Sequence, residues 1–301
     1  MADVPFEEKR LRGAGIDLQA DAWGDPAHPP VLLMHGGGQT RHAWGGTARV
    51  LAARGWYAVS IDLRGHGESD WSPDGAYHLD HFVADLRAVA AGFSRLPVLV
   101  GASLGGMTAM AAEGDQPGSA GRALVLVDVG HRLESQGVAR IIEFMTADIE
   151  EGFESLEEAA ASVARFLPHR PAPRDLTGLR KNLREGPDGR WRWHWDPRFM
   201  GVHLDGSDGP PAGVPRIADP ERLERSVQGL RLPTLLVRGR MSDVLSEEGA
   251  QDFLRAVPHA RFVDISGASH MVAGDRNDVF TDAVVSFLEA LERDESSTGA
   301  S

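Results

Sequence analysis

The stretch Val98-Leu-Val-Gly-Ala-Ser-Leu-Gly-Gly106 decides how this chain folds. An apolar run ends in Gly101-Ala-Ser-Leu-Gly105, and a helix-like segment follows at once. This G-x-S-x-G pattern is typical of a nucleophile elbow, a sharp turn from strand to helix that exposes a serine hydroxyl at its tip. Glycine suits the positions beside such a turn because it has no Cβ to clash with neighbouring backbone. The alternative is a glycine-rich turn with an incidental serine, since short motifs also occur by chance.

Length and composition indicate an ordinary globular protein. The 301 residues are 42% hydrophobic and 25% charged, which suits one large domain or a domain with an insertion. A formal net charge of −13 argues against nucleic acid as a partner, because phosphate backbones would be repelled. The absence of cysteine excludes disulfides, thiolate metal sites and cysteine nucleophiles.

The sequence carries no recognisable targeting or membrane segment. The first residues, Met1-Ala-Asp-Val-Pro-Phe-Glu-Glu8, have neither the basic nor the apolar run of a signal peptide. No apolar run approaches the ~20 residues that a membrane span needs. We therefore expect a cytoplasmic protein with no membrane partner, as a monomer or a homodimer.

Buried strands alternate with amphipathic helices on both sides of the elbow. Short apolar runs predict strands, and apolar residues spaced three and four apart predict helices. Alternating residues in 6–24 predict a hairpin. Further strands are predicted at 31–34, 57–61, 98–100, 123–127, 234–237 and 261–265, and helices at 44–54, 79–93, 104–112, 247–257 and 279–291. This alternation predicts an α/β fold with a mostly parallel sheet and helices on both faces.

A long insertion interrupts this alternation. Over 100 residues separate Val127 from Thr234, whereas a strand–helix–strand unit needs only about 30. The surplus has helical patterning, and a structureless loop of that length would be unusual in a compact domain. We predict a core of residues 1–130 and 226–301 and an inserted helical cap of residues 131–225.

Two downstream residues are candidates for the groups that would activate Ser103. A serine hydroxyl needs a base, and the base needs an acid that fixes its tautomer, in the chain order Ser, Asp or Glu, His. Asp243 and His270 each follow a predicted strand closely, at the sheet edge where α/β proteins place ligands. We expect Ser103, His270 and Asp243 to form a catalytic triad. Asp128, which also ends a predicted strand, is the alternative acid, and a helix N-cap is the alternative role for Asp243.

The oxyanion of a tetrahedral intermediate needs two backbone N–H donors. One is expected from Leu104, directly after the nucleophile, and the other from the loop His35-Gly-Gly-Gly38. Glycines in that loop would let backbone approach the substrate. We expect Gly37 to be the second donor, with Gly38 as the alternative and a substrate contact. His35 is expected to hold the loop rather than to react.

The same glycines do not form a phosphate-binding motif. Gly36-x-Gly38 would need a third glycine at position 41, where Arg41 stands, and no G-x-x-x-x-G-K-[ST] occurs. No H-E-x-x-H or other tight ligand cluster occurs either. The sequence therefore implies neither a metal nor a cofactor.

Together these motifs resemble the α/β-hydrolase superfamily, in the branch with a helical cap. The matching segments are residues 35–38, 62–69, 101–106, 238–243 and 267–270, and the similarity covers 6–130 and 226–292. The resemblance implies an α/β-hydrolase fold with an eight-stranded, mostly parallel sheet. It also implies a serine esterase or lactonase that needs no cofactor. The segment 62–69 is a family hallmark that we interpret as structural.

The family also contains epoxide hydrolases and haloalkane dehalogenases, which attack with a carboxylate. Ser103 stands where that carboxylate would be, and neither tyrosine of the chain, Tyr57 or Tyr77, lies in the cap that would supply the acid for epoxide opening. Both reactions are therefore disfavoured. The resemblance leaves open C–C bond hydrolysis and cofactor-free perhydrolysis with the same triad, and a silent small-molecule-binding protein.

The predicted cap carries the candidate specificity residues. Trp191, Trp193 and Trp195 alternate with polar residues, which would place them on one face of an extended segment. They are candidate substrate contacts, and packing of cap on core is the alternative. Large aromatics favour a small apolar or aryl ester or lactone. The charged residues of 150–198 are expected to be solvated faces, and attraction of an anionic substrate is the alternative.

Overall fold

The computed structural model describes residues 4–168, 175–202, 219–272 and 277–298. Its main sheet comprises β1 (Phe6–Arg12), β2 (Asp17–Trp23), β3 (Pro30–Met34), β4 (Tyr57–Ile61), β5 (Val98–Ala102), β6 (Ala123–Val127), β9 (Thr234–Gly239) and β10 (Arg261–Ile265). The strands lie in the order β1-β2-β4-β3-β5-β6-β9-β10. Only β2 with β1 and β2 with β4 pair antiparallel; the remaining pairs are parallel. The predicted eight-stranded, mostly parallel sheet is confirmed.

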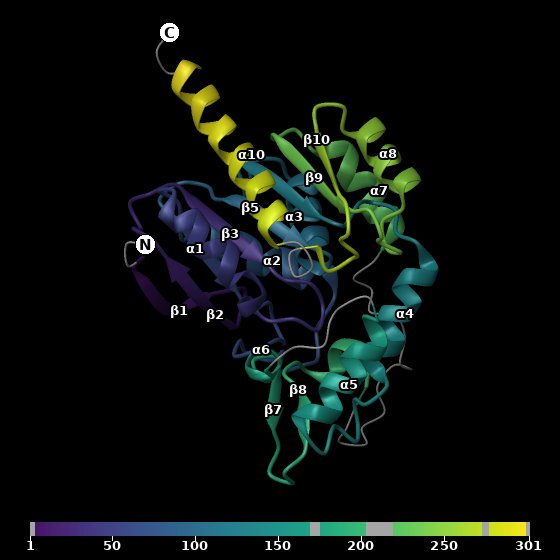
Figure 1. Cartoon of the computed structure of the whole chain (residues 1–301). Helices are drawn as coiled ribbons and strands as arrows, with labels where there is room; N and C mark the ends of the chain where they lie inside the picture. The colour runs from purple at the N-terminus through teal and green to yellow at the C-terminus, as the bar shows by residue number, and fades with distance from the viewer. Residues whose placement is uncertain (1–3, 169–174, 203–218, 273–276, 299–301) are drawn as a thin grey trace.

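Helices cover both faces of this sheet, as its apolar strands require. In β3, Val31 and Leu33 face one hydrophobic cluster, and Leu32 and Met34 face the other. The first cluster is completed by α1 (Gly45–Ala53) and α10 (Asn277–Thr298), the second by α2 (Leu79–Ala90), α3 (Leu104–Asp115), α7 (Pro220–Gly229) and α8 (Glu247–Ala256). Figure 1 shows α1 and α10 together on one face. In the part of the chain that the structure describes, no helix is long and apolar enough to cross a membrane.

Helix α3 is held close to its neighbour by glycines. A Cβ on Gly229 of α7 would lie 2.0 Å from the carbonyl oxygen of Gly114 in α3, so only glycine allows this approach. Because α3 begins directly after Ser103, the packing fixes the position of that serine relative to the sheet.

The insertion between β6 and α7 is less helical than the patterning predicts. It contains α4 (Ser135–Thr146), α5 (Leu156–Phe166), α6 (Thr177–Arg180), the antiparallel pair β7 (Leu183–Glu185) and β8 (Trp191–Trp193), and the 3-10 turn η2 (Pro197–Met200). Figure 1 shows these elements gathered at one end of the core. Helix α7 packs against α3 and begins at Pro220, ahead of the predicted boundary at 226. The division at residues 131 and 225, like the role of a cap, stays a prediction.

Several contacts tie the insertion to the loop that follows β4. The N–H of Gly67 donates to the carbonyl of His194 at 2.6 Å, and the N–H of Asp196 donates to the carbonyl of Gly65 at 2.7 Å. The Tyr77 hydroxyl donates to the buried Asp196 carboxylate at 2.5 Å. The insertion therefore lies over the carboxyl-terminal edge of the sheet.

Candidate active site

Ser103 stands between β5 and α3 in a conformation that side chains rarely adopt. Its φ is 45° and its ψ −111°. Such a residue costs about 1–3 kcal/mol and persists only where the surroundings enforce it. Its N–H donates to the carbonyl of Val127 at 3.4 Å, and its own carbonyl accepts from the N–H of Met107 at 2.8 Å. The geometry is that of the predicted nucleophile elbow.

The glycines of the motif make this turn possible. A Cβ on Gly101 would lie 2.5 Å from the backbone of Gly105, and a Cβ on Gly105 would lie 2.6 Å from the carbonyl oxygen of Met34. Contacts below 3.0 Å between such atoms cannot be accommodated without moving backbone. The elbow therefore needs glycine at both positions, and the reading of an incidental serine in a glycine-rich turn loses its support.

The glycine loop after β3 is pinned by two buried histidines. The N–H of Leu63 donates to Nε2 of His35 at 3.0 Å, and Nδ1 of His35 contacts the carbonyl of Gly36 at 2.7 Å. The N–H of Gly38 donates to Nε2 of His66 at 3.2 Å. Burial lowers the pKa of His35 to about 4 and that of His66 to about 3, so both rings are neutral at pH 7. His35 holds the loop, as the sequence predicts.

Two backbone donors near Ser103 remain available. Within the described residues, no acceptor lies opposite the N–H groups of Gly37 and Leu104. Leu104 is the first residue of α3, where helical N–H groups lack intrahelical partners. The N–H of Gly38 is occupied by His66, which argues against Gly38 as the alternative donor. This pattern fits the predicted pair of Gly37 and Leu104.

The glycine loop meets both Ser103 and the segment after β10. A Cβ on Gly36 would lie 3.3 Å from the Cβ of Ser103. The Gln39 amide accepts from the N–H of Gly36 at 3.0 Å and donates to Sδ of Met271 at 3.0 Å. Because Met271 follows His270, one glutamine links the loops that carry the candidate donors and the candidate base.

His270 is paired with Asp128. Its Nδ1 donates to Oδ2 of Asp128 at 2.8 Å, and the carboxylate is fully buried while the imidazole is 15% exposed. This contact fixes the tautomer that leaves Nε2 free to accept a proton. Asp128 is the alternative acid that the sequence offers, and the geometry favours it.

The structure contradicts the prediction that Asp243 is the partner of His270. The Asp243 carboxylate forms an ion pair with Arg140 of α4 at 2.8 Å, and its side chain is 38% exposed. It also does not cap the following helix, since Ser246 accepts the N–H of Gly249 there. The turn after β9 points Asp243 toward the insertion.

Ser242, the residue before Asp243, contacts the acid that pairs with His270. Its hydroxyl donates to Oδ2 of Asp128 at 2.5 Å and accepts the N–H groups of Val244 and Leu245 at 3.1 and 3.2 Å. The N–H of Gly239 donates to the other carboxylate oxygen of Asp128 at 2.9 Å. Three donors therefore hold the carboxylate, as a buried charge requires. Ser242 was not among the predicted site residues; its hydroxyl accepts the N–H groups two and three residues further along the chain, and the residue type alone signals such a local turn only weakly.

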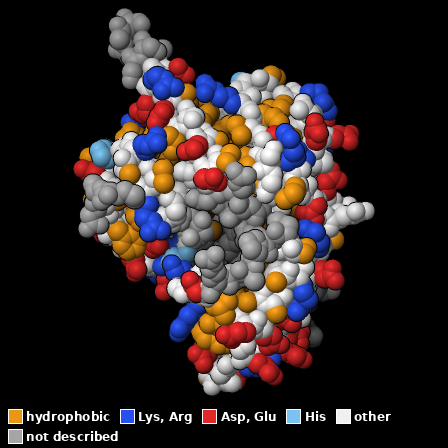
Figure 2. Space-filling model, in the orientation of Figure 1, with side chains coloured by type: hydrophobic (Ala, Val, Ile, Leu, Met, Phe, Trp, Pro, Cys, Tyr) orange, Lys and Arg blue, Asp and Glu red, His pale blue; other side chains and the backbone are white. Residues whose placement is uncertain are grey.

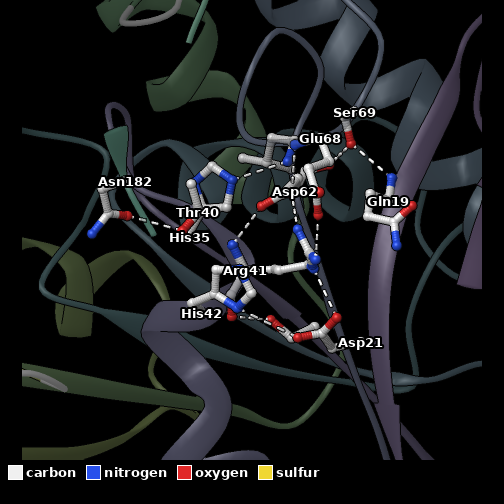
Figure 3. A network of polar contacts seen from close by, with 12 residues as sticks. Gln19, Asp21, His35, Thr40, Arg41, His42, Asp62, Glu68, Ser69 and Asn182 are labelled. Atoms are coloured by element: carbon white, nitrogen blue, oxygen red, sulfur yellow. Dashed lines mark hydrogen bonds and ion pairs between the residues drawn. The ribbon is translucent and has the colours of Figure 1, made fainter. Parts of the chain in front are cut away.

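A buried charge network supports the glycine loop from behind (Figure 3). Arg41, the residue that breaks the dinucleotide pattern, contacts Asp21 at 2.8 Å, Asp62 at 2.6 Å and Glu68 at 2.5 Å. The backbone N–H of Arg41 also donates to Asp62 at 2.6 Å. Such a pair is costly to break, because the partner left behind would be a buried charge. The segment 62–69 is structural here, as interpreted from sequence.

The three tryptophans of the insertion divide between two environments. Trp191 and Trp193 pack beside Phe153 in a small cluster within the insertion. Trp195 is buried in the main core and lies edge-on to Phe199. The ring of Phe199 lies 3.6 Å from the place of a Cβ on Gly37, so Phe199 rather than a tryptophan approaches the glycine loop. Their role as substrate contacts stays a prediction, and packing within the insertion explains Trp191.

No metal centre is evident in the part of the chain described. Among residues 4–168, 175–202, 219–272 and 277–298, no three His, Asp or Glu side chains gather in a way that could hold an ion. The chemistry that these residues offer is nucleophilic attack assisted by an imidazole.

Fold and site together define a class: an α/β protein with a strained serine at the carboxyl end of a central parallel strand and an Asp–His pair on neighbouring loops. Residues 31–283 match the sequence profile of the alpha/beta hydrolase family. The chain belongs to this family.

Relatives of the chain cover most of its length. It is 30% identical to esterase Rv0045c of Mycobacterium tuberculosis, over 91% of this chain and 86% of the relative. It is 30% identical to the 3-hydroxybutyrate-oligomer hydrolase of Cupriavidus necator, over 85% of this chain and 88% of the relative.

Solved structures show the same fold. The crystal structure of esterase Rv0045c has a TM-score of 0.70 at 29% identity, over 95% of this chain and 92% of that one. The structure of E-2-(acetamidomethylene)succinate hydrolase has a TM-score of 0.80 at 22% identity, over 95% of this chain and 100% of that one.

Proposed function

We propose that this protein is a serine hydrolase that cleaves carboxylic esters or lactones through an acyl-enzyme on Ser103. The observation that carries the proposal is the strained serine beside two unoccupied backbone donors, on a sheet edge that also presents His270 paired with the buried Asp128. The family membership and the two relatives named as an esterase and an oligomer hydrolase support ester bonds as the target.

The geometry suggests a role for each group. His270 takes the proton of Ser103 as its oxygen attacks the substrate carbonyl. The N–H groups of Gly37 and Leu104 stabilise the oxyanion. Asp128 keeps the His270 imidazole in the required tautomer and stabilises its positive charge. His270 then protonates the leaving alcohol and activates the water that releases the acid.

Apolar side chains over the glycine loop favour an apolar acyl group. The Cε of Met145, on α4, lies 3.1 Å from the place of a Cβ on Gly38. The ring of Phe199 lies 3.6 Å from the place of a Cβ on Gly37. An acyl chain beside the proposed oxyanion donors would therefore contact a thioether and an aromatic ring, both of which pack well against hydrocarbon.

Hydrolysis of nitrophenyl esters with acyl chains of graded length tests the proposal. We expect the wild-type protein to hydrolyse them and Ser103→Ala to lose at least about a thousandfold in kcat, since the nucleophile would be gone. Hydrolysis of γ- and δ-lactones by the same pair of proteins extends the test to cyclic esters. A Ser103→Ala protein with wild-type kcat would contradict the proposal.

A further inference from the structure

A separate pocket lies where the insertion meets the core. Its volume is about 290 Å³, and its described walls come from the loop after β4, from the β7–β8 pair and from the segment 195–202. Trp71 is the contribution of the core loop. The glycine loop, Ser103 and His270 are not among these walls. The proposed ester chemistry therefore does not account for this pocket.

Among the described walls of the pocket, three arginine side chains stand against one carboxylate, that of Asp196. Three arginines line it: Arg184, Arg192 and Arg198. Arg192 is paired with Asp188 at 2.7 Å, and Arg198 is paired with Asp196 at 2.7 Å.

Arg184 differs from the other two arginines. Among the described residues, no carboxylate lies within ion-pair distance of it. Its guanidinium instead lies over the ring of Trp71, 4.5 Å from the ring centre.

The placement of Arg184 works against the stability of the β7–β8 pair. Arg184 lies directly opposite Arg192 in the antiparallel register. Like charges in that position destabilise a strand pair. A site for an anion explains an arrangement that folding alone would not favour.

The remaining walls are aromatic and aliphatic. Trp193, Trp195 and Ile149 line the pocket beside Trp71. The flat guanidinium of Arg184 is already oriented by its stack on Trp71, so its N–H groups can present a planar fork to two carboxylate oxygens. An apolar or aryl body would fill the space beside the tryptophans.

We propose that this pocket binds the carboxylate of a small organic acid with an aryl or alkyl body, with Arg184 as the anchor. The acid has two possible sources. It is either the distal carboxylate of a half-ester substrate or a free acid of the kind that ester hydrolysis releases. Trp195, in the pocket wall, contacts Phe199 with 6.3 Å between ring centres, and Phe199 lies against Gly37. One aromatic pair, Trp195 and Phe199, thus separates the pocket from the proposed oxyanion donors. Of the two sources of the acid, only the half-ester substrate rests on the proposed function.

Direct binding tests the shared chemistry without any need for catalysis. Calorimetric titration with 4-phenylbutyrate is compared with titration with the neutral 4-phenylbutyramide, on the full-length protein. We expect binding of the acid only, and a loss of about tenfold or more in affinity in Arg184→Gln, because a charge-assisted contact is removed.

Two further variants are controls for this titration. Arg165→Gln removes the same charge from an exposed position on α5, outside the pocket, and should bind like the wild type. Arg184→Lys keeps the charge without the planar fork and should fall between wild type and Arg184→Gln.

A kinetic arm separates the two sources of the acid. Nitrophenyl half-esters of dicarboxylic acids are compared with neutral esters of equal chain length, in wild type and Arg184→Gln. A rise in KM in Arg184→Gln for the half-esters alone assigns the pocket to the substrate. Acid binding that needs Arg184, with unchanged KM, assigns it to a free acid. Acid binding and KM values that are both unaffected by Arg184→Gln overturn the proposal, whatever becomes of Ser103 catalysis.

Discussion

Ser103 and Asp128 are the two non-glycine residues with positive φ in the described chain, at 45° and 52°. They stand at the ends of the neighbouring strands β5 and β6. Each conformation costs about 1–3 kcal/mol. Asp128 is held by three hydrogen-bond donors, and Ser103 by the glycine contacts of the elbow. Backbone strain and the proposed chemistry thus coincide at the residue scale.

Asp128, rather than Asp243, pairs with His270, and substitutions at the two aspartates test this assignment. Asp128→Asn should lower kcat on nitrophenyl esters by about 10³- to 10⁴-fold, because the amide would favour the wrong His270 tautomer. Asp243→Asn is the matched control and should change kcat by no more than a few fold, since Asp243 pairs with Arg140. The opposite ranking of the two variants, in steady-state kinetics, would return the acid role to Asp243.

Ser242 gives a second prediction. Ser242→Ala removes one donor from the buried Asp128 carboxylate and should lower kcat by about tenfold while leaving KM nearly unchanged. Ser242→Thr keeps the hydroxyl and should recover most of the loss. Equal kcat values in Ser242→Ala and wild type would show that Gly239 and His270 alone position the carboxylate.

At the scale of loops and elements, the glycine loop depends on two neutral histidines. The pKa of each is lowered by burial, to about 4 in His35 and about 3 in His66, from 6.5. In the unfolded chain both rings take up protons near pH 6.5, whereas in the folded chain they do not until much lower pH. Their contribution to stability is therefore complete above pH 6.5 and is lost as the pH falls from 6.5 toward 4 for His35 and toward 3 for His66.

His66→Gln tests this dependence. Each buried neutral histidine contributes a slope of up to about 1.4 kcal/mol per pH unit in that window. The amide oxygen of the variant can still accept from the N–H of Gly38. Its free energy of unfolding should therefore fall less steeply with decreasing pH, by up to that amount. Guanidinium denaturation between pH 4 and pH 7 measures the slope. Identical slopes in the variant and the wild type would mean that His66 is protonated in the folded protein.

The elbow glycines give a prediction at the same scale. Gly101→Ala places a Cβ 2.5 Å from the backbone of Gly105 and should destabilise the protein by about 3 kcal/mol or more, because strand and helix must move apart. Gly45→Ala, in α1, meets no atom within 4 Å and should be neutral or slightly stabilising. Thermal unfolding compares the two; similar Tm values would contradict the tight elbow.

The sequence could predict where site residues stand in the chain but not which way they face. Asp128 and Asp243 both follow strands, and β6 and β9 are neighbours in the sheet. The choice between them depends on the positive φ of Asp128 and on the turn around Ser242. These are local backbone conformations that the residue type does not predict at positions other than glycine. Ser103, His270 and the glycine loop were predictable because their motifs specify conformation as well as position.

At the scale of the whole molecule, the core was predictable and the insertion was not. Apolar runs of five residues that are buried on both faces can pair only in a helix-covered sheet, so the strands of the core agree with their predicted ranges. The insertion has less hydrophobic patterning, and its β7–β8 pair was not predicted. Acidic side chains gather at the far tip of the insertion in Figure 2, which suits the solvated face expected for Glu150 to Glu158.

The junction between insertion and core gives a prediction at this scale. Tyr77→Phe removes the hydroxyl that contacts the buried Asp196, and burial and this contact both raise the pKa of Tyr77. The protein should lose about 2 kcal/mol of stability, since a buried carboxylate loses a donor. Tyr57→Phe, which loses only a 3.2 Å contact with Lys9, should change stability by less than about 0.5 kcal/mol. Equal losses in urea denaturation would contradict the importance of this junction.

We propose that Ser103 is a nucleophile activated by His270 and Asp128. Peptide mapping by mass spectrometry after treatment with a fluorophosphonate, which labels only activated serines, tests this proposal. We expect one phosphonylated residue, Ser103, with labelling at least about a hundredfold slower in Asp128→Asn and absent in Ser103→Ala. A protein that hydrolyses esters while Ser103 stays unlabelled, or that is labelled elsewhere, would contradict it.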